Sequence, residues 1–164
     1  MKIRKAVMTD FPAIIKVYKS VTKHMLTNNI FQWDDLYPDE SILKMDIEEK
    51  TMYLCEIKTV IAAIFVLNQE CDPEYETGDW QYKNPSFSVI HRLCVNPNFQ
   101  GMGVGKQALL SAESILRKEG MSSVRLDAFS QNPAALRLYY NLGYLKVGQV
   151  NFRKGLFYLF EKRL

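Results

Sequence analysis

Apolar residues follow one another, or alternate with polar ones, in seven short runs along the chain. Each run is long enough for a strand, and Gly, Pro, Asn or Asp residues separate most of the runs from their neighbours. The runs cover residues 3–7, 52–57, 60–67, 87–95, 124–128, 144–150 and 156–162. We therefore predict seven strands, with 87–95 as the central one.

Four other segments have apolar residues at the spacing of an amphipathic helix. They lie at 10–18, 38–47, 104–118 and 132–143. Thr9 or Asp10 can cap the first of these helices, and Asn132 can cap the last. Pro133 follows Asn132 at the first helical position, where a missing N–H group costs nothing. The chain thus predicts a strand, two helices, three strands, and then alternating helices and strands that end in a strand pair.

The strand 87–95 leads into a glycine-rich loop. The chain breaks at Asn96-Pro97 and continues as QGMGVG, residues 100–105, into the third helix. Alternate glycines allow positive φ angles and let a bulky ligand approach the backbone. Because the loop opens a helix, the free N–H groups of the first helical turn point to the same place. This arrangement suits a phosphate group.

The spacing of the loop can be compared with three phosphate-binding patterns. A nucleotide P-loop requires G-x-x-x-x-G-K-S/T, but here one residue too few precedes Lys106, and Gln107 replaces the hydroxyl residue. A dinucleotide fingerprint requires G-x-G-x-x-G directly after a strand and an acidic residue about 20 positions further on. Asp127 could be that acidic residue, but Lys106 replaces the third glycine, and residues 96–100 separate the strand from the loop. The pyrophosphate loop of coenzyme A, Q/R-x-x-G-x-G/A, fits 100–105 without a gap. A glycine-rich turn without a ligand is the fourth interpretation.

A second block supports the coenzyme A interpretation. From Asp127 the chain reads DAFSQNPAALRLYYNLGYLKVG, which meets the pattern N-x-x-A-x-x-L-Y-x-x-x-G-F/Y at every fixed position. These positions are Asn132, Ala135, Leu138, Tyr139, Gly143 and Tyr144. Together with Val95-Asn96-Pro97 and the loop 100–105, the block makes the chain resemble the GCN5-related N-acetyltransferase (GNAT) superfamily. The resemblance covers essentially the whole chain and is sharpest over 89–147.

The resemblance implies an α/β fold for 1–164 as a single domain. In this GNAT-like fold the elements follow the order β-α-α-β-β-β-α-β-α-β-β, and the central mixed sheet splays between two parallel strands to form a cleft. One departure is Ala62-Ala63, where family members commonly have a glycine. This difference concerns packing and not chemistry.

The resemblance also implies acetyl transfer from acetyl-CoA, as co-substrate, to an amine, with no metal ion. In the family the acetyl carbonyl and pantetheine contact the central strand, and the pyrophosphate lies on the loop that follows it. The corresponding residues are Leu93, Cys94, Val95, Gln100, Gly101, Met102, Gly103, Val104, Gly105, Lys106 and Asn132. Tyr139 corresponds to the tyrosine that protonates the leaving thiolate. The alternatives are helix capping for Asn132 and core packing for Tyr139.

The sequence offers two residues for the general base. Neutralising a primary amine with a pKa near 10.4 at pH 7 costs about 4.6 kcal/mol, so a base, a water chain or desolvation must help. In relatives the base often lies on the central strand, on the face toward the cleft. Val89 and His91 share that face, and His91 is the titratable one. Asp127 is either a second base or an anchor for Arg92 or Arg125.

Acceptor binding is expected from two acidic segments, 33–40 and 70–79, which border the acceptor end of the cleft in the family. The candidate residues are Trp33, Tyr37, Trp80 and Asp127. One interpretation is an anionic, aromatic-lined mouth for a cationic small-molecule or peptide amine, and the other is two solvated loops. A non-catalytic acyl-CoA-binding or regulatory module on the same fold is the alternative to an enzyme.

Composition excludes several other classes of protein. The 164 residues carry a net charge of +3 without a basic stripe, and no apolar run of about 18 residues occurs, so we expect neither nucleic acid nor a membrane as partner. Cys55, Cys71 and Cys94 are odd in number and are typical of reduced cysteines. The segment MKIRKAVMTD lacks the apolar core of a secretion signal. We expect a cytoplasmic protein, and the sequence leaves open whether it forms a homodimer.

Overall fold

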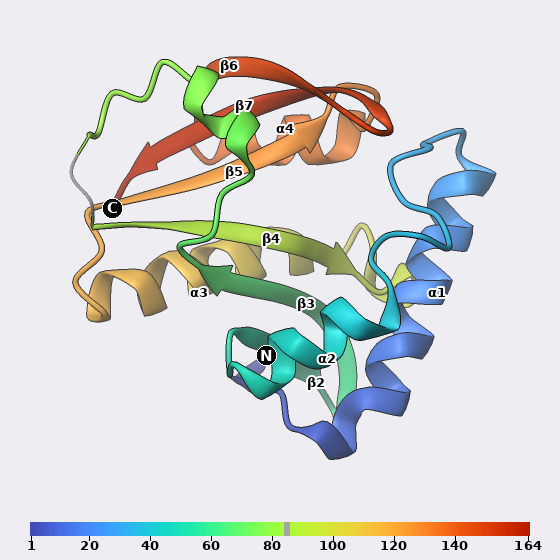
Figure 1. Cartoon of the computed structure of the whole chain (residues 1–164). Coiled ribbons are helices and arrows are strands. Elements are labelled where there is room, and N and C mark those ends of the chain that lie inside the picture. Colours follow the sequence, from blue (N-terminus) through green and yellow to red (C-terminus); the bar gives the residue numbers. More distant parts are fainter. Residues whose placement is uncertain (84–85) are drawn as a thin grey trace. The chain divides into compact units, whose positions relative to one another are not determined.

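A computed structural model describes residues 1–83 and 86–164. The strands are β1 (Lys2–Lys5), β2 (Met52–Ile57), β3 (Val60–Asn68), β4 (Phe87–Val95), β5 (Ser123–Phe129), β6 (Leu145–Phe152) and β7 (Gly155–Arg163). The α-helices are α1 (Phe11–Thr27), α2 (Glu40–Glu48), α3 (Val104–Lys118) and α4 (Pro133–Asn141). This confirms the predicted order of helices and strands (Figure 1). Three short 3-10 helices are added, η1 (Met8–Asp10), η2 (Pro73–Thr77) and η3 (Pro97–Phe99).

The strand order is β1-β2-β3-β4-β5-β7-β6. The sheet is mixed, because β4 and β5 are parallel while β1 with β2, β2 with β3, β5 with β7 and β6 with β7 are antiparallel. The parallel register pairs 87–89 with 123–125, whereas β5 continues to Phe129. The α/β class with a mixed sheet is confirmed.

The residues group into two compact units. The first contains 1–67 and 92–111, and the second contains 68–91 and 112–164. β4 and α3 each contribute residues to both units. In the described residues, no helix has the length and apolar content that crossing a membrane requires.

In the first unit, buried side chains of α1 and α2 form one hydrophobic cluster with those of β2 and β3. The buried residues of α1, Ile14, Val17, Tyr18 and Val21, form the single stripe that helical spacing predicts. The side chain of Asp39 accepts a hydrogen bond from the N–H of Ile42 and so caps α2. β1 is shorter than predicted, because the N–H of Val7 donates to the carboxylate of Asp10 and leaves the strand.

In the second unit, β7 lies between β5 and β6, and β6 and β7 form a long hairpin, drawn in red tones in Figure 1. The acidic segment 70–79, for which a solvated loop was one interpretation, contains η2 and the buried ring of Tyr75, and the ring of Trp80 directly after it is also buried. The N–H of Asp79 also donates to the carbonyl of Val147 on β6. This segment therefore packs as part of its unit, which its polar composition did not indicate.

Candidate functional site

Asn96 fixes the start of the glycine-rich loop. Its backbone N–H donates to the carbonyl oxygen of Ala62 at 2.9 Å, and its side-chain amide donates to that of Ile61 at 2.9 Å. Its side-chain oxygen accepts from the N–H of Asn98 at 3.1 Å, which turns the chain into η3. The break predicted at Asn96-Pro97 is thus held against β3.

Gly101 and Gly103 give the loop its shape. Both have a φ of +76°, whereas Gly105 lies inside α3. A Cβ added to either of the first two would meet no protein atom within 4 Å, so the space beside them is open. The N–H of Gln107 donates to the carbonyl of Gly103 at 3.1 Å and closes the first turn of α3.

This geometry fits a pyrophosphate. The N–H groups of 104–106 precede the first intrahelical donor and have no acceptor in their own helix. Gly101 and Gly103 add left-handed residues just before the helix, and left-handed residues next to helical ones are typical of backbone anion sites. The positive end of the helix dipole and the neighbouring Lys106 both favour negative charge there.

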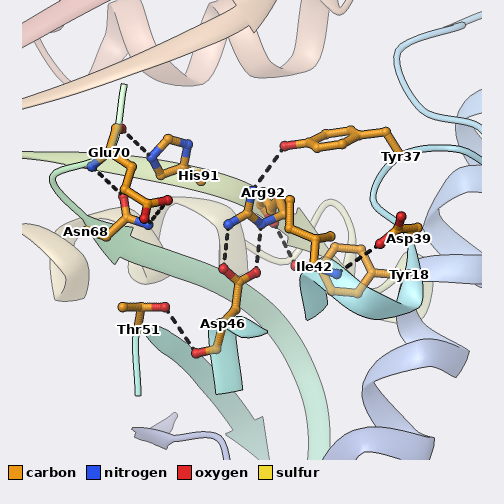
Figure 2. Close-up of polar contacts among 10 residues, drawn as sticks. All are labelled: Tyr18, Tyr37, Asp39, Ile42, Asp46, Thr51, Asn68, Glu70, His91 and Arg92. Atoms are coloured by element: carbon orange, nitrogen blue, oxygen red, sulfur yellow. Dashed lines mark hydrogen bonds and ion pairs between the residues drawn. The ribbon is translucent and has the colours of Figure 1, made fainter. Parts of the chain in front are cut away.

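Arg92 interrupts the regular backbone of β4. Its φ of +51° is left-handed, which costs a residue with a Cβ about 1–2 kcal/mol. Its guanidinium group donates to the carboxylate of Asp46 at 2.8 Å from Nε and 2.6 Å from Nη2 (Figure 2). Nη1 donates to the hydroxyl of Tyr37 at 3.2 Å, and the hydroxyl of Tyr18 donates to the Arg92 carbonyl at 3.1 Å. A charged residue inside an apolar strand was the one sequence signal for this arrangement.

Leu93, Cys94 and Val95 follow this break and lead to the loop. Leu93 and Val95 are half-buried, and Cys94 is buried. Burial raises the pKa of the Cys94 thiol to about 12, so the group is neutral near pH 7. What this segment can offer a ligand is therefore its backbone N–H and C=O groups.

His91 is half-buried at the position before the break. Its Nε2 lies 3.1 Å from the carbonyl oxygen of Glu70 (Figure 2). A carbonyl oxygen can only accept, so Nε2 carries the hydrogen, and Nδ1 is the nitrogen that could take up a proton. Val89, predicted on the same side of the strand, is fully buried.

Tyr139 lies on α4 with its ring packed against Tyr144 and Phe160, each at a centroid distance of 5.8 Å. The side chain is 7% exposed. Burial, and after it the negative charge of Asp127, raises the pKa of Tyr139 well above its ordinary value. The phenol is therefore a protonated donor near neutral pH. The neighbouring Tyr140 is half-exposed and packs edge-on against Phe160.

Asn132 caps α4 as predicted. Its side-chain oxygen accepts from the N–H of Ala135 at 3.1 Å, and Pro133 occupies the first helical position. The contact with pantetheine that the resemblance implies for Asn132 stays a prediction.

Asp127 on β5 accepts a hydrogen bond from Tyr75, a residue that was not among the predicted site residues. The buried hydroxyl of Tyr75 donates to its carboxylate at 2.7 Å. Burial, and then the charge of Asp127, raises the pKa of Tyr75, which keeps this hydroxyl a donor. An aromatic residue inside an acidic segment was the one signal for Tyr75. Asp127 was also considered as an anchor for Arg92 or Arg125. The acid that pairs with Arg92 is Asp46, and the acid beside Arg125 is Glu161, at 3.5 Å.

Trp80 and Trp33 pack inside their units. Trp80 is 9% exposed, donates from Nε1 to the carbonyl of Tyr75 at 2.7 Å, and lies against the guanidinium of Arg125. Trp33 is 3% exposed and packs against Tyr18. The burial of these two indole rings leaves little of them for an acceptor to contact.

Tyr37 differs from the two tryptophans because it is 37% exposed. It lines a cavity of about 360 Å³ with the side chains of Leu36, Asp39, Ser41, Ile42 and Met45. The hydrogen bond from the N–H of Ile42, and after it the one from the Ser41 side chain, lowers the pKa of Asp39. The cavity lining therefore includes a carboxylate. On the second unit, the acids Glu74 and Glu76 are exposed on η2.

Comparison with known proteins adds family evidence to this geometry. The family model of the acetyltransferase (GNAT) family matches residues 18–144. L-methionine sulfoximine/L-methionine sulfone acetyltransferase of Salmonella typhimurium is 24% identical over 92% of this chain and 83% of its own length. Mycothiol acetyltransferase of Streptosporangium roseum is 33% identical over 42% of this chain. The matched part spans 20% of that relative's length.

Solved structures share the fold over nearly the whole chain. A GNAT-family acetyltransferase from Streptococcus agalactiae has a TM-score of 0.85 at 18% identity, covering 99% of this chain and 95% of its own. The PaiA N-acetyltransferase from Thermoplasma acidophilum, crystallised in complex with coenzyme A, has a TM-score of 0.76 at 19% identity. It covers 99% of this chain and 98% of its own.

Proposed function

The chain belongs to the acetyltransferase (GNAT) family, and on this premise we propose that it transfers the acetyl group of acetyl-CoA to the nitrogen of an amine. The observation that carries the proposal is the loop around Gly101 and Gly103. Its two left-handed glycines, the open space beside them and the start of a 15-residue helix support an anion site at the position where the family pattern has one. No metal enters the proposal.

Two segments of the first unit would hold the co-substrate. The N–H groups of 101–106, with Gln100 at the start of the loop, would bind the pyrophosphate. The backbone of 93–95 would bond to pantetheine and to the acetyl carbonyl. Backbone N–H donors suit this task because they are already oriented and lose no rotamer freedom when they bind. Acetyl-CoA, when bound, supplies a thioester that an amine can attack directly.

Tyr139 would give its proton to the sulfur as the carbon–sulfur bond breaks and the carbon–nitrogen bond forms. The raised pKa of Tyr139 keeps the phenol protonated before the reaction. The same shift makes the phenol a weaker acid, so a change that lowers this pKa during turnover would help.

Asp127 offers such a change. If its carboxylate takes up the proton that the attacking amine loses, the negative charge that raises the pKa of Tyr139 disappears at the moment the thiolate needs a proton. The 2.7 Å hydrogen bond from Tyr75 would orient this carboxylate. His91, acting through Nδ1, is the second candidate for the base. Both assignments are proposals for the same step.

The acceptor we propose is a small-molecule or peptide amine of cationic character. Support comes from the exposed acids Glu74 and Glu76 and from the carboxylate of Asp39 beside Tyr37. The relative from Salmonella is named for two amino-acid derivatives, which agrees with a small amine. We further propose a cytoplasmic location, because Cys55, Cys71 and Cys94 are free thiols.

Titration calorimetry tests whether the loop binds coenzyme A. Acetyl-CoA and coenzyme A should both bind, and NAD should not bind at comparable concentration. Tight NAD binding without coenzyme A binding would establish the dinucleotide interpretation instead. Binding of acetyl-CoA with no turnover of any amine would identify a non-catalytic acyl-CoA-binding module.

A further inference from the structure

Three parts of the first unit hold Arg92 at once, through its backbone and its side chain (Figure 2). Tyr18 of α1 donates to its carbonyl oxygen, and Asp46 of α2 accepts two hydrogen bonds from its guanidinium. Tyr37, from the segment between α1 and α2, accepts a third. We call the set of Arg92, Asp46 and Tyr37 the arginine clamp.

The arginine clamp is difficult to explain by stability alone. Arg92 keeps a left-handed φ inside a strand, where a residue with a Cβ is strained. Its side chain is 7% exposed and that of Asp46 is 2%, so two charges lose their hydration. Apolar replacement of such a buried pair is often neutral or stabilising. Strained backbone and desolvated charge together are typical of functional sites.

The arginine clamp holds two neighbouring parts of the molecule. One is the backbone of 93–95, which follows Arg92 directly and is the segment proposed to contact the acetyl group. The other is the side chain of Tyr37, whose hydroxyl is bonded to Arg92 and whose ring lines the cavity beside α2. A planar guanidinium with several donors in fixed directions can hold a carboxylate and a hydroxyl in one geometry, which a lysine cannot do.

We propose that Arg92 is a positioning residue whose ion pair with Asp46 aligns the backbone of 93–95 on the acetyl group and holds Tyr37 for the acceptor. The inference rests on the proposed function. It assigns no bond-making step to Arg92, which acts through the backbone and through Tyr37.

The main test replaces the ion pair by apolar side chains, in the double variant Arg92→Met/Asp46→Leu. The melting temperature should stay the same or rise, because no unpaired charge is left in the core. The kcat should fall about 100-fold, the loss that a displacement of about 1 Å can cause. Because the backbone of 93–95 is proposed to bond to the acetyl carbonyl, the wild type should bind acetyl-CoA more tightly than coenzyme A. Calorimetry should show that this preference is lost in the double variant, while coenzyme A itself binds as in the wild type.

Two single variants complete the test. Arg92→Lys keeps the charge but loses the fork geometry, so it should show the same loss of kcat in a smaller degree, and it remains informative if the double variant does not fold. Tyr37→Phe keeps the ring and removes the acceptor of the third hydrogen bond. It should raise the acceptor KM about fivefold, the usual worth of one hydrogen bond, and leave the KM for acetyl-CoA unchanged.

The outcomes separate the clamp from the proposed function. If the wild-type protein binds neither coenzyme A nor acetyl-CoA, the proposed function fails and the positioning role fails with it. If the wild type is active and the folded double variant keeps its kcat and its preference for acetyl-CoA, only the positioning role is overturned. The arginine clamp is then a feature of the core without effect on turnover.

Discussion

Tyr139 presents two properties, packing and hydrogen-bond donation, that one substitution can separate. Tyr139→Phe keeps the ring contacts with Tyr144 and Phe160 and removes only the hydroxyl. The thiol of coenzyme A resembles that of cysteine, with a pKa of about 8.5, so its thiolate leaves more easily without help as the pH rises. General acid help is worth about 100-fold at its lower end, and we expect that loss of kcat at pH 7.

The pH dependence of the Tyr139→Phe deficit follows from the direction of the pKa shift. Because the pKa of Tyr139 is raised, the wild-type phenol keeps its proton throughout a profile from pH 6 to about 9, where an ordinary tyrosine of pKa about 10 would begin to lose it. The deficit should therefore shrink toward pH 9 only because the thiolate needs less help. Tyr140→Phe, one residue further on, is the control and should behave as the wild type. Wild-type activity of Tyr139→Phe at pH 7 would remove Tyr139 from the mechanism, and a deficit independent of pH would assign it to positioning.

At the scale of elements, the N-terminus of α4 combines a structural and a proposed binding role in Asn132. Asn132→Ser keeps a capping side chain, whereas Asn132→Ala removes it and should lower the stability by about 1 kcal/mol. If Asn132 also contacts pantetheine, both variants should raise the KM for acetyl-CoA, while only the alanine variant loses thermal stability. If the KM for acetyl-CoA rises only in the alanine variant, which also loses thermal stability, capping is the whole role of Asn132.

The loop that precedes α3 can be tested with a matched pair of glycines. Gly103 at the start of α3 and Gly120 just beyond its end both have positive φ, +76° and +81°, and open space beside them. Valine at either position should therefore cost similar stability, about 1–2 kcal/mol. We expect Gly103→Val to weaken coenzyme A binding about 100-fold through the loss of charge-assisted hydrogen bonds, and Gly120→Val to leave it unchanged. Equal affinity in the two folded proteins would show that the pyrophosphate lies elsewhere.

At the scale of the whole molecule, the charge of the chain gives little guidance, since a net charge of +3 coexists with exposed acids on η2. Neutralising Glu74 and Glu76 by glutamine should raise the KM of a cationic amine more than that of a neutral one. Rising salt should have the same effect on the wild type, because ions screen exposed charges. The control Glu49→Gln/Glu119→Gln neutralises two exposed glutamates at the ends of α2 and α3, changes the net charge equally, and should alter neither KM. If both double variants behave alike, the acids of η2 are only a solvated surface.

The sequence predicted those features that depend on local signals. The bounds of β2 and β4 agree with the predicted 52–57 and 87–95, because polar residues interrupt the apolar pattern at the ends of both runs. The loop geometry at Gly101 and Gly103 follows from the glycine spacing. The arginine clamp could not be predicted, because Asp46 and Tyr37 lie 46 and 55 residues before Arg92 in the chain. The pairing of Tyr75 with Asp127 spans 52 residues and was missed for the same reason.

Burial of aromatic side chains was the other property that local pattern could not give. Trp33 begins one polar, acidic segment and Trp80 follows the other, and one interpretation placed both rings at the mouth of an acceptor site. In the structure both indoles fill space inside their units, with exposures of 3% and 9%. A polar segment can thus carry one large anchor side chain into a core while its other residues face water.

Release of free thiol from acetyl-CoA, followed with and without an amine, tests the central claim most directly. The account predicts slow release in the absence of amine and fast, saturable release when a cationic amine from a panel is added, with one acetylated amine formed for each thiol. A protein that binds acetyl-CoA but releases no thiol with any amine of the panel, or that releases it at a rate independent of amine, would contradict the assignment as an acetyl-CoA:amine N-acetyltransferase.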